Sequence, residues 1–428
     1  MPPVSVKDVT NKSQEGINLT TKWQIIQVKP NLDEFSQAGR STYLRVDLEA
    51  IWNNIQILKG KCSEKTEVIA VVKANAYGHG SVEVARYLNK CGLFHFAVAT
   101  ALEGKELREN GVTGYIQVLG NCVEEEINMM LKYNLTPTAT NLQFIKKWAA
   151  SIAQHYERVP SNGMLINVDT DWDKPKVVIK VDTGMSRNGC QCKELKSLME
   201  ACENNGIPVH SIMTHFAQAW DDPLSTQEQL KRFLEATKSY RCMGVKVHAA
   251  NSAAIMQGYA TDLDFVRPGI AMYGLAPEPT PEAAAMMQTM GLRPALAWIA
   301  RPCLIKSLDA GRKVGYNQAY RLKQQERIAT FSFGYADGYN RLLSGKGVLT
   351  DVSGKEYEIV GRVSMDAVTV RVDDSVTVQT PFYVIRDDYN SPNSASNIAQ
   401  MLDTIPYEIG TSLSIRLPRI YHTKHKDN

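Results

Sequence analysis

Short apolar runs alternate with amphipathic stretches along residues 41–291, and this alternation predicts the fold of the first part of the chain. The clearest run, 68–72, has five apolar residues, four of them valine or isoleucine, which is typical of a strand buried on both faces. Further strands are expected at 95–100, 115–119, 136–139, 176–181, 210–214, 246–249 and 264–267. Helical patterns follow nearly all of these strands, and such alternation indicates a parallel sheet.

Eight strands within about 200 residues predict an α/β fold with a closed (β/α)8 barrel, which we place at residues 41–291. An open doubly wound sheet is the alternative, but no glycine-rich fingerprint opens a helix after the first strand. A strand at 41–47 and a helix at 48–59 are expected to begin this domain. Residues 1–40 are expected to form an N-terminal extension, with a possible edge strand at 22–28.

The pattern changes after Gly291, where short strands separated by turns replace the strand–helix alternation. Strands are expected at 302–308, 327–333, 347–350, 358–363, 368–372 and 382–387. One helix at 394–402 and a last strand around 412–417 complete the pattern. Residues 292–428 are therefore predicted to form a mostly β C-terminal domain.

The composition is ordinary for a soluble globular protein, with 44% hydrophobic and 22% charged residues. A net charge of +3 is too small to indicate binding to nucleic acid or to a membrane surface. The first forty residues are polar and lack the apolar core of a secretion signal, so we expect a cytoplasmic protein. The eight cysteines are expected to be free thiols, and only Cys62 and Cys91 are considered for a disulfide.

Polar side chains gather where the predicted barrel strands end, which is where barrel enzymes carry their active sites. Lys73 ends the first strand, and partial desolvation there would lower the pKa of its amine, as a nucleophile or base requires. The other polar or glycine-flanked strand ends hold Tyr77, Lys180, Arg187, Thr214, His215, His248, Asn251, Ser252, Arg267, Gly269 and Ile270. Each has an ordinary structural role open to it, such as a helix cap for Ser252. Their convergence on one face predicts a common active site.

The types of residue at these strand ends suggest a particular cofactor. The hydroxyl of Ser252, Tyr77 and the backbone N–H groups near Gly269 suit a phosphate, which often binds after strands seven and eight of a barrel. A lysine that faces a phosphate site suits covalent attachment of pyridoxal phosphate. No acidic residue stands at an obvious position for a metal ligand, so we expect no metal site.

Residues 70–80, AVVKANAYGHG, closely resemble the cofactor-attachment signature of alanine racemases. Further segments resemble the same family in the same order: RVDL at 45–48, FAVAT at 96–100, VDTGM at 181–185, THFA at 214–217, VRPGI at 266–270, VGY at 314–316, GYADG at 334–338 and VSMD at 363–366. The resemblance extends over both predicted domains. It implies a pyridoxal phosphate-dependent racemase with a barrel and a β domain.

The resemblance also implies roles for particular residues. Lys73 would bind the cofactor and then act as one catalytic base, and Tyr316 of a partner subunit would act as the other, so the enzyme would be a homodimer with shared active sites. Cofactor contacts are implied for Tyr77, His215, His248, Asn251, Ser252, Arg267, Gly269 and Ile270. Contacts with the amino acid substrate are implied for Arg187, Met365 and Tyr335. Lys180 matches a position that is carbamylated in many members.

Two positions depart from the usual pattern of the family. Ile415 stands where a tyrosine usually binds the cofactor phosphate, so one phosphate contact is expected to be lost. Asn188 stands where alanine-specific members tend to have leucine, and a polar residue there is similar to the broad-specificity racemases. L- and D-alanine are the expected substrates, with serine or a broader range as the alternative.

Two other classes of protein share part of this pattern. A decarboxylase of the same architecture would have an acidic residue facing the cofactor ring and a cysteine as its acid, whereas this chain has Arg267 and Tyr316. A non-catalytic cofactor carrier would lack the β domain.

Overall fold

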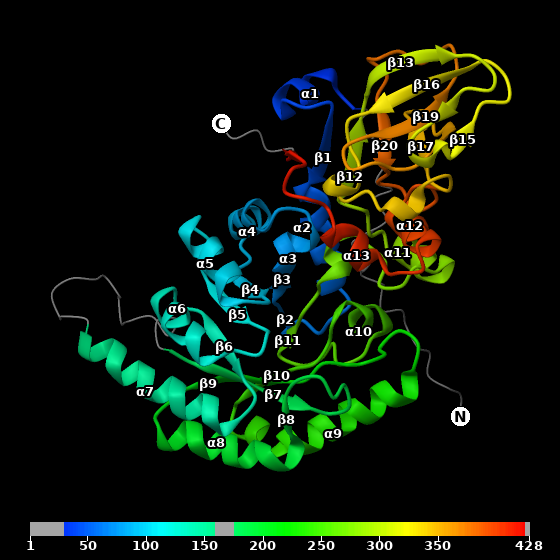
Figure 1. Cartoon of the computed structure of the whole chain (residues 1–428). Coiled ribbons are helices and arrows are strands. Elements are labelled where there is room, and N and C mark those ends of the chain that lie inside the picture. Colours follow the sequence, from blue (N-terminus) through cyan, green and yellow to red (C-terminus); the bar gives the residue numbers. More distant parts are fainter. Residues whose placement is uncertain (1–29, 159–174, 424–428) are drawn as a thin grey trace, which may run out of the picture.

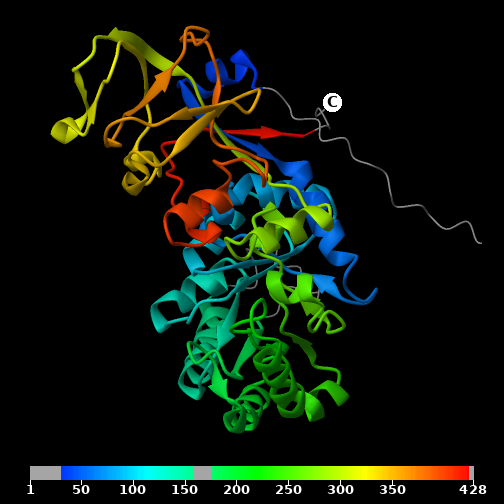
Figure 2. The ribbon, with the colours of Figure 1, turned by 90° about the vertical axis from the view of Figure 1, so that its right-hand side faces the viewer.

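The computed structural model describes residues 30–158 and 175–423, which form a barrel with a β domain at one end (Figure 1). The possible edge strand at 22–28 lies outside these residues. A view turned by 90° again shows the β domain at the end of the barrel, with helices α12 (Ala395–Met401) and α13 (Pro406–Thr411) between the two (Figure 2). Within the described ranges, no helix is long and apolar enough to cross a membrane.

The barrel is one parallel sheet whose two ends meet. In order around the barrel, its strands are β2 (Glu67–Val68), β11 (Phe265–Val266), β10 (Lys246–His248), β9 (Val209–Met213), β7 (Val177–Asp182), β6 (Thr136–Ala139), β5 (Tyr115–Val118), β4 (His95–Val98) and β3 (Ala70–Val71). β2 pairs with β11 and β3 pairs with β4, and only Ile69 separates β2 from β3. They are therefore two segments of one strand, and the predicted (β/α)8 barrel is confirmed.

Helices cover the outside of this barrel (Figure 1). They are α2 (Leu48–Lys59), α4 (Ser81–Lys90), α5 (Ala101–Glu109), α6 (Ile127–Lys132), α7 (Leu142–Arg158), α8 (Leu195–Asn204), α9 (Pro223–Cys242) and α10 (Ser252–Gln257). Local side chains start several of them: Asp47 accepts a hydrogen bond from Ala50 N at 2.8 Å, which caps α2. All residues of β5 and β6 are buried, as expected for strands with one face in the barrel core and the other under helices.

The β domain consists of two larger sheets and a hairpin. One sheet has the order β18 (Glu356–Glu358), β17 (Val348–Asp351), β20 (Phe382–Ile385), β12 (Leu296–Ala300), β1 (Thr42–Asp47) and β21 (Arg419–His422). The other contains β13 (Pro302–Leu308), β16 (Glu326–Phe331) and β19 (Val368–Val372), and the hairpin joins β14 (Lys313–Val314) to β15 (Tyr320–Arg321). A mostly β C-terminal domain is therefore confirmed.

β1 lies in the sheet of the β domain, although the strand at 41–47 was expected to begin the barrel. It pairs antiparallel with β12 and parallel with β21, and α1 (Leu32–Ala38) packs against it. The apolar pattern predicts a buried strand but does not identify its partners, because central strands of both sheets are buried on both faces. The division of the chain at residues 40 and 291 stays a prediction, but the strand pairing does not support residue 41 as the start of the barrel.

Two predicted strands near the C-terminus are wrong. Residues 412–417 follow α13 as a turn, and the last described strand is β21, which begins after Pro418. The strand expected at 358–363 is reduced to the end of β18 and one isolated bridge between Ile359 and Val370. β12 and α11 (Pro281–Thr289) were not predicted. All eight cysteines are free, so Cys62 and Cys91 form no disulfide.

The barrel and the β domain touch closely where Gly78 meets α13. Gly78 has φ +88°, and a Cβ atom on it would lie only 2.1 Å from the carbonyl oxygen of Gly410. Gly78 also follows the segment that carries Lys73. The contact between the two backbones therefore fixes this segment against the β domain.

We expect Gly78→Ala to destabilise the protein far more than Gly92→Ala. Gly92 has the same φ of +88°, but a Cβ atom on it would have no other atom within 4 Å, so it is a matched control for the backbone strain alone. Gly78→Ala must also push α13 away, which should cost about 2 kcal/mol more in the free energy of unfolding. Urea unfolding of both variants measures this difference, and equal losses would contradict the close contact.

Candidate active site

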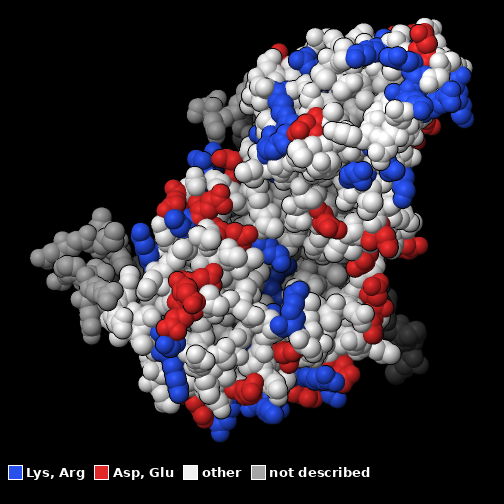
Figure 3. Space-filling model, viewed as in Figure 1, with Lys and Arg blue, Asp and Glu red and all other residues white. Residues whose placement is uncertain are grey.

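A cavity of about 750 Å³ opens at the carboxyl ends of the barrel strands. Ten residues predicted from the sequence line it: Lys73, Tyr77, Lys180, Arg187, His215, Asn251, Ser252, Arg267, Gly269 and Ile270. The space-filling view shows basic side chains at a hollow in the middle of the face seen there (Figure 3). The structure therefore brings these ten residues together in one cavity, whereas Thr214 and His248 are not among the residues that line it.

Lys73 begins an unusual turn that the sequence did not predict. The helix α3 (Lys73–Tyr77) contains four consecutive residues, Ala74 to Tyr77, with φ between 51° and 53°. This is a left-handed turn made without glycine, and each such residue costs on the order of 1–2 kcal/mol. The turn places Lys73 and Tyr77 in the same cavity, and so it needs support from its surroundings.

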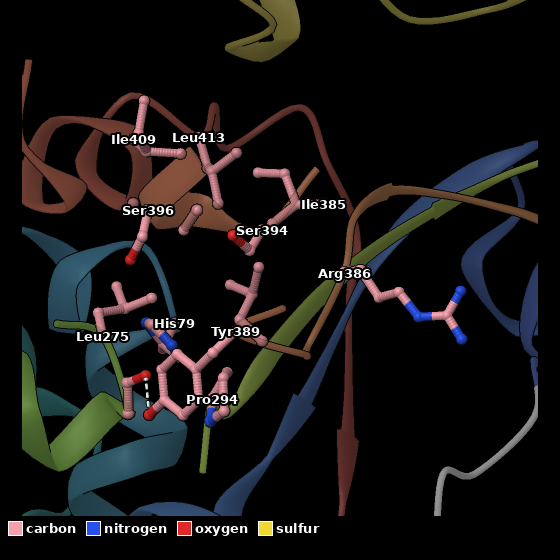
Figure 4. Close-up of a pocket in the computed structure, with 14 residues that line it drawn as sticks. His79, Leu275, Pro294, Ile385, Arg386, Tyr389, Ser394, Ser396, Ile409 and Leu413 are labelled. Atoms are coloured by element: carbon pink, nitrogen blue, oxygen red, sulfur yellow. Dashed lines mark hydrogen bonds between the residues drawn. The ribbon is translucent and has the colours of Figure 1, made fainter. Parts of the chain in front are cut away.

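His79 supports the carbonyl end of this turn. Its Nδ1 lies 3.0 Å from the carbonyl oxygen of Ala76 and 3.1 Å from that of Tyr77, so Nδ1 carries the hydrogen and donates. Burial lowers the pKa of His79 to about 4, which keeps the ring neutral. His79 also lines a small cavity of about 20 Å³ beneath the turn, beside Leu275 and Tyr389 (Figure 4).

Arg267, at the end of β11, is held in one orientation. Its Nη1 lies 2.5 Å from Nδ1 of His248, and Nη2 donates to the carbonyl oxygens of Thr214 and Ala249 at 2.7 and 2.9 Å. His248 in turn bonds through Nε2 to Ser211 Oγ at 2.9 Å, and burial together with the charge of Arg267 keeps its pKa well below the usual value. Burial lowers the pKa of Arg267 to about 9, so the guanidinium keeps its charge at neutral pH.

The cavity gathers several cationic groups. Burial and then the charge of Arg187 lower the pKa of Lys73. Burial, followed by the charges of Arg267 and Arg187, lowers the pKa of Lys180 to about 8. Burial and Arg267 keep the pKa of His215 well below its usual value, so this ring is neutral. A cavity with this charge suits anionic ligands and holds amines that can lose a proton.

One wall of the cavity offers converging hydrogen-bond donors. Ser252 Oγ accepts the N–H groups of Gly269 at 2.9 Å and Ala271 at 3.2 Å. A Cβ atom on Gly269 would lie 2.6 Å from Tyr77 Oη, so glycine is needed for the close approach of these groups. Asn251 lines the same wall and caps α10 by accepting from Ala254 N at 3.0 Å. Both N–H groups donate to Ser252 Oγ in this structure, so a phosphate would have to replace this oxygen as their acceptor.

Three predicted site residues do not reach this cavity within one chain. Tyr316, in the hairpin of the β domain, is 71% exposed, and Tyr335 and Met365 are 43% and 52% exposed. None of the three lines the cavity. Ile415 is 88% exposed, also on the C-terminal domain. The barrel part of the predicted site is therefore assembled in one chain, and the part from the β domain points outwards.

Several residues of the site were missed by sequence reasoning. Trp220, Glu278 and Tyr407 line the cavity from loops and from α13, and no pattern in the sequence marks them. Glu103 contacts the backbone next to Lys73, and only the Thr100–Glu103 capping box could have drawn attention to it. Asn188, which the sequence analysis had singled out, lines the cavity as well, and its buried Oδ1 has no hydrogen-bond partner among the described residues.

The fold and the cavity define a barrel enzyme whose cationic cavity contains a lysine of lowered pKa. The sequence also matches a known protein family over most of its length. The alanine racemase N-terminal domain matches residues 46–277, and the alanine racemase C-terminal domain matches residues 295–421. The chain therefore belongs to the alanine racemase family.

Individual relatives agree with this family over most of the chain. The alanine racemase of Carboxydothermus hydrogenoformans is 36% identical over 388 residues, covering 89% of this chain and all of the relative. That of Desulforamulus reducens is 37% identical over 385 residues, covering 89% and 98%. Among solved structures, the alanine racemase of Bacillus anthracis with bound L-Ala-P has a TM-score of 0.77 at 34% identity, covering 90% of this chain and 96% of that one. That of Clostridium difficile has a TM-score of 0.78 at 30% identity, covering 89% and 96%.

Proposed function

We propose that this enzyme interconverts L- and D-alanine with pyridoxal phosphate as its cofactor and with two bases, Lys73 and Tyr316. The observation that carries the proposal is that Lys73, Arg267 and Gly269 line the same cavity. The family relationship supports alanine as the substrate, because the relatives that match nearly the whole chain are alanine racemases.

The residues of the cavity fit pyridoxal phosphate. Lys73 would hold it covalently, and Ser252, Tyr77 and the N–H groups near Gly269 and Ile270 would bind its phosphate. The converging donors at Ser252 Oγ and the space kept open by Gly269 support this fit. His215 and Asn251 would line its ring and phosphate ends. When bound, the cofactor supplies an electron sink that makes the Cα–H of an amino acid acidic.

Arg267 would face the ring nitrogen of the cofactor. Its Nη atoms are bonded to His248 and to backbone carbonyls, so its orientation is fixed. Since arginine does not readily give up a proton, Arg267 would leave the ring nitrogen unprotonated. The electron sink would then be weaker, which would favour return of a proton to Cα over transamination or elimination.

Racemisation requires a base on each face of Cα, and only one candidate base of the proposed pair lies in the cavity of a single chain. Lys73 lines the cavity, whereas Tyr316 is 71% exposed on the β domain. We therefore infer a homodimer in which Tyr316 of each subunit reaches the cavity of the other. Tyr335 and the backbone of Met365 would enter in the same way, and Met365 would bind the substrate carboxylate together with Arg187.

Lys180 is proposed to carry a carbamate. Its pKa of about 8 leaves part of the amine unprotonated near neutral pH, which is the form that reacts with carbon dioxide. A carbamate would place a negative charge beside Arg187 and Arg267 and would orient Arg187 towards the substrate. A cytoplasmic location and the lack of nucleic acid or membrane partners stay predictions.

The direct test follows the circular dichroism of L-alanine and of D-alanine with purified enzyme. We expect both signals to decay to zero, and release of ammonia or carbon dioxide instead would contradict the proposal.

Lys73→Ala should lose the visible absorbance of the bound cofactor and at least about 1000-fold in activity, because both of its roles are removed. Lys231→Ala, which changes an exposed lysine on α9, is the control and should leave both unchanged.

Tyr316→Phe should keep the visible absorbance but lose about 100-fold or more in racemisation, because one of the two bases is removed. The variant should still exchange the Cα hydrogen of one alanine enantiomer with solvent deuterium, as measured by NMR. Tyr133→Phe, at a tyrosine that does not line the cavity, is the control. Full racemisation in both directions would contradict the two-base assignment.

Mixing the two inactive variants tests the shared site. Random pairing of Lys73→Ala and Tyr316→Phe subunits makes half of the dimers mixed, and each mixed dimer has one intact site, so about a quarter of the wild-type activity should return. If both residues acted within one chain, no activity would return.

Serine is a second candidate substrate, because the polar residue Asn188 lines the cavity. The amide of Asn188 would offer a hydrogen bond to a substrate hydroxyl, whereas alanine has no such group. We expect Asn188→Leu to lower kcat/KM for serine about tenfold, the value of one lost hydrogen bond, while alanine serves as the internal control. An equal change for both substrates would contradict a role in binding the hydroxyl.

A further inference from the structure

The carboxylate of Glu103 joins the ends of two neighbouring barrel strands. Its Oε1 accepts the N–H of Ala74 at 2.7 Å, and its Oε2 accepts the N–H groups of Ala99 at 2.6 Å and Thr100 at 3.2 Å. Ala74 directly follows Lys73, and Ala99 and Thr100 follow β4. Hydrogen bonds from N–H groups to a carboxylate are among the stronger ones, so this contact is well suited to hold two strand ends in register.

Only part of this arrangement belongs to ordinary helix capping. Glu103 is the third residue of α5, and it forms a capping box with Thr100, whose Oγ1 accepts from Glu103 N at 3.3 Å. A capping box needs one side-chain acceptor, which glutamine supplies as well as glutamate. The bond to Ala74 uses the second carboxylate oxygen, and it has no part in starting α5.

The bond to Ala74 supports the left-handed turn at the end where Lys73 lies. His79 holds the carbonyl oxygens at the other end of the turn, and Arg419 Nε donates to the carbonyl oxygen of Gly78 at 2.8 Å. Glu103 thus acts at the lysine end and His79 at the opposite end. Without the carboxylate, the amide next to Lys73 would lose its acceptor and the strained backbone could relax.

Glu103 also acts on Lys73 through its charge. Burial and the charge of Arg187 lower the pKa of the Lys73 amine, and the negative charge of Glu103 raises it. Removal of this charge should therefore lower the pKa of Lys73 further. This effect comes from the charge of the carboxylate and is separate from its hydrogen bonds.

We propose that Glu103 is a positioning residue for Lys73, which fixes the backbone of the lysine through the N–H of Ala74 and aligns it with the end of β4. The inference rests on the proposed role of Lys73 as the cofactor lysine and catalytic base. It assigns to one carboxylate the task of holding a strained turn in the orientation that presents the amine to the cavity.

Glu103→Gln is the informative variant, because it keeps an acceptor for the capping box but loses the second carboxylate oxygen and the charge. Glu106→Gln, one turn further along α5 and exposed, is the matched control. We expect Glu103→Gln to reduce kcat for alanine at least tenfold with KM changed less than threefold, and to keep a thermal midpoint close to that of the control. Glu103→Ala should lose kcat as well and also lower the thermal midpoint.

The state of Lys73 is measured separately on cofactor-free protein, by following its modification with an amine reagent against pH by mass spectrometry. The pH midpoint of Lys73 modification should move to lower pH in Glu103→Gln and stay unchanged in Glu106→Gln. If Glu103→Gln matches the control in both kcat and the pH midpoint of Lys73 modification, the proposal is overturned. A lowered thermal midpoint with unchanged kcat would show that Glu103 only caps α5, and it would overturn the proposal as well. Failure of the cofactor role of Lys73 would appear instead in Lys73→Ala, and the modification profile would still report on Glu103.

Discussion

The left-handed turn that follows Lys73 is the constraint on which the active site depends. Four consecutive residues, Ala74 to Tyr77, keep positive φ without a single glycine. Such a turn persists only where its surroundings hold it. Here the support comes from the barrel through Glu103 and His79 and from the β domain through the backbone of α13. The position of the lysine is therefore a property of the whole described chain and not of one strand.

The cavity beside this turn concentrates positive charge, and the repulsion between these charges is a cost that an anionic ligand can offset. Lys73, Lys180, Arg187 and Arg267 line one cavity, and their mutual repulsion contributes to the lowered pKa values of both lysines. A phosphate and a carboxylate would each relieve part of this repulsion. The cationic groups are already in place before an anion binds. They repel one another in the empty cavity and attract an anion once it is bound, so the arrangement favours the bound state.

The sequence predicted the barrel better than the β domain, for a physical reason. Barrel strands are buried on both faces and are separated by amphipathic helices, so strand β6 and helix α2 were predicted with the residues that they occupy. The convergence of the polar strand ends followed from the barrel prediction, because the carboxyl ends of all barrel strands lie on one face. The partners of β1 did not, because strand pairing over long distances leaves no local pattern.

The turn after Lys73 and the role of Glu103 were also beyond local reasoning. The segment Ala74–Tyr77 contains no glycine that would indicate positive φ in the sequence, and contacts with distant segments hold the turn. Tyr316 was identified by resemblance and not by pattern, and it is 71% exposed on the β domain.

The pairing of β1 with both β12 and β21 has a consequence for synthesis of the chain. β1 is completed at Asp47, whereas its partners lie at Leu296–Ala300 and Arg419–His422. In terms of topology, the barrel is an insertion within the β domain. During translation the barrel can close while β1 is still unpaired. The six-stranded sheet is complete only when its edge strand β21 has been synthesised. Contacts of such long range slow folding. The β domain, which carries Tyr316, is therefore expected to be the last part of the enzyme to mature.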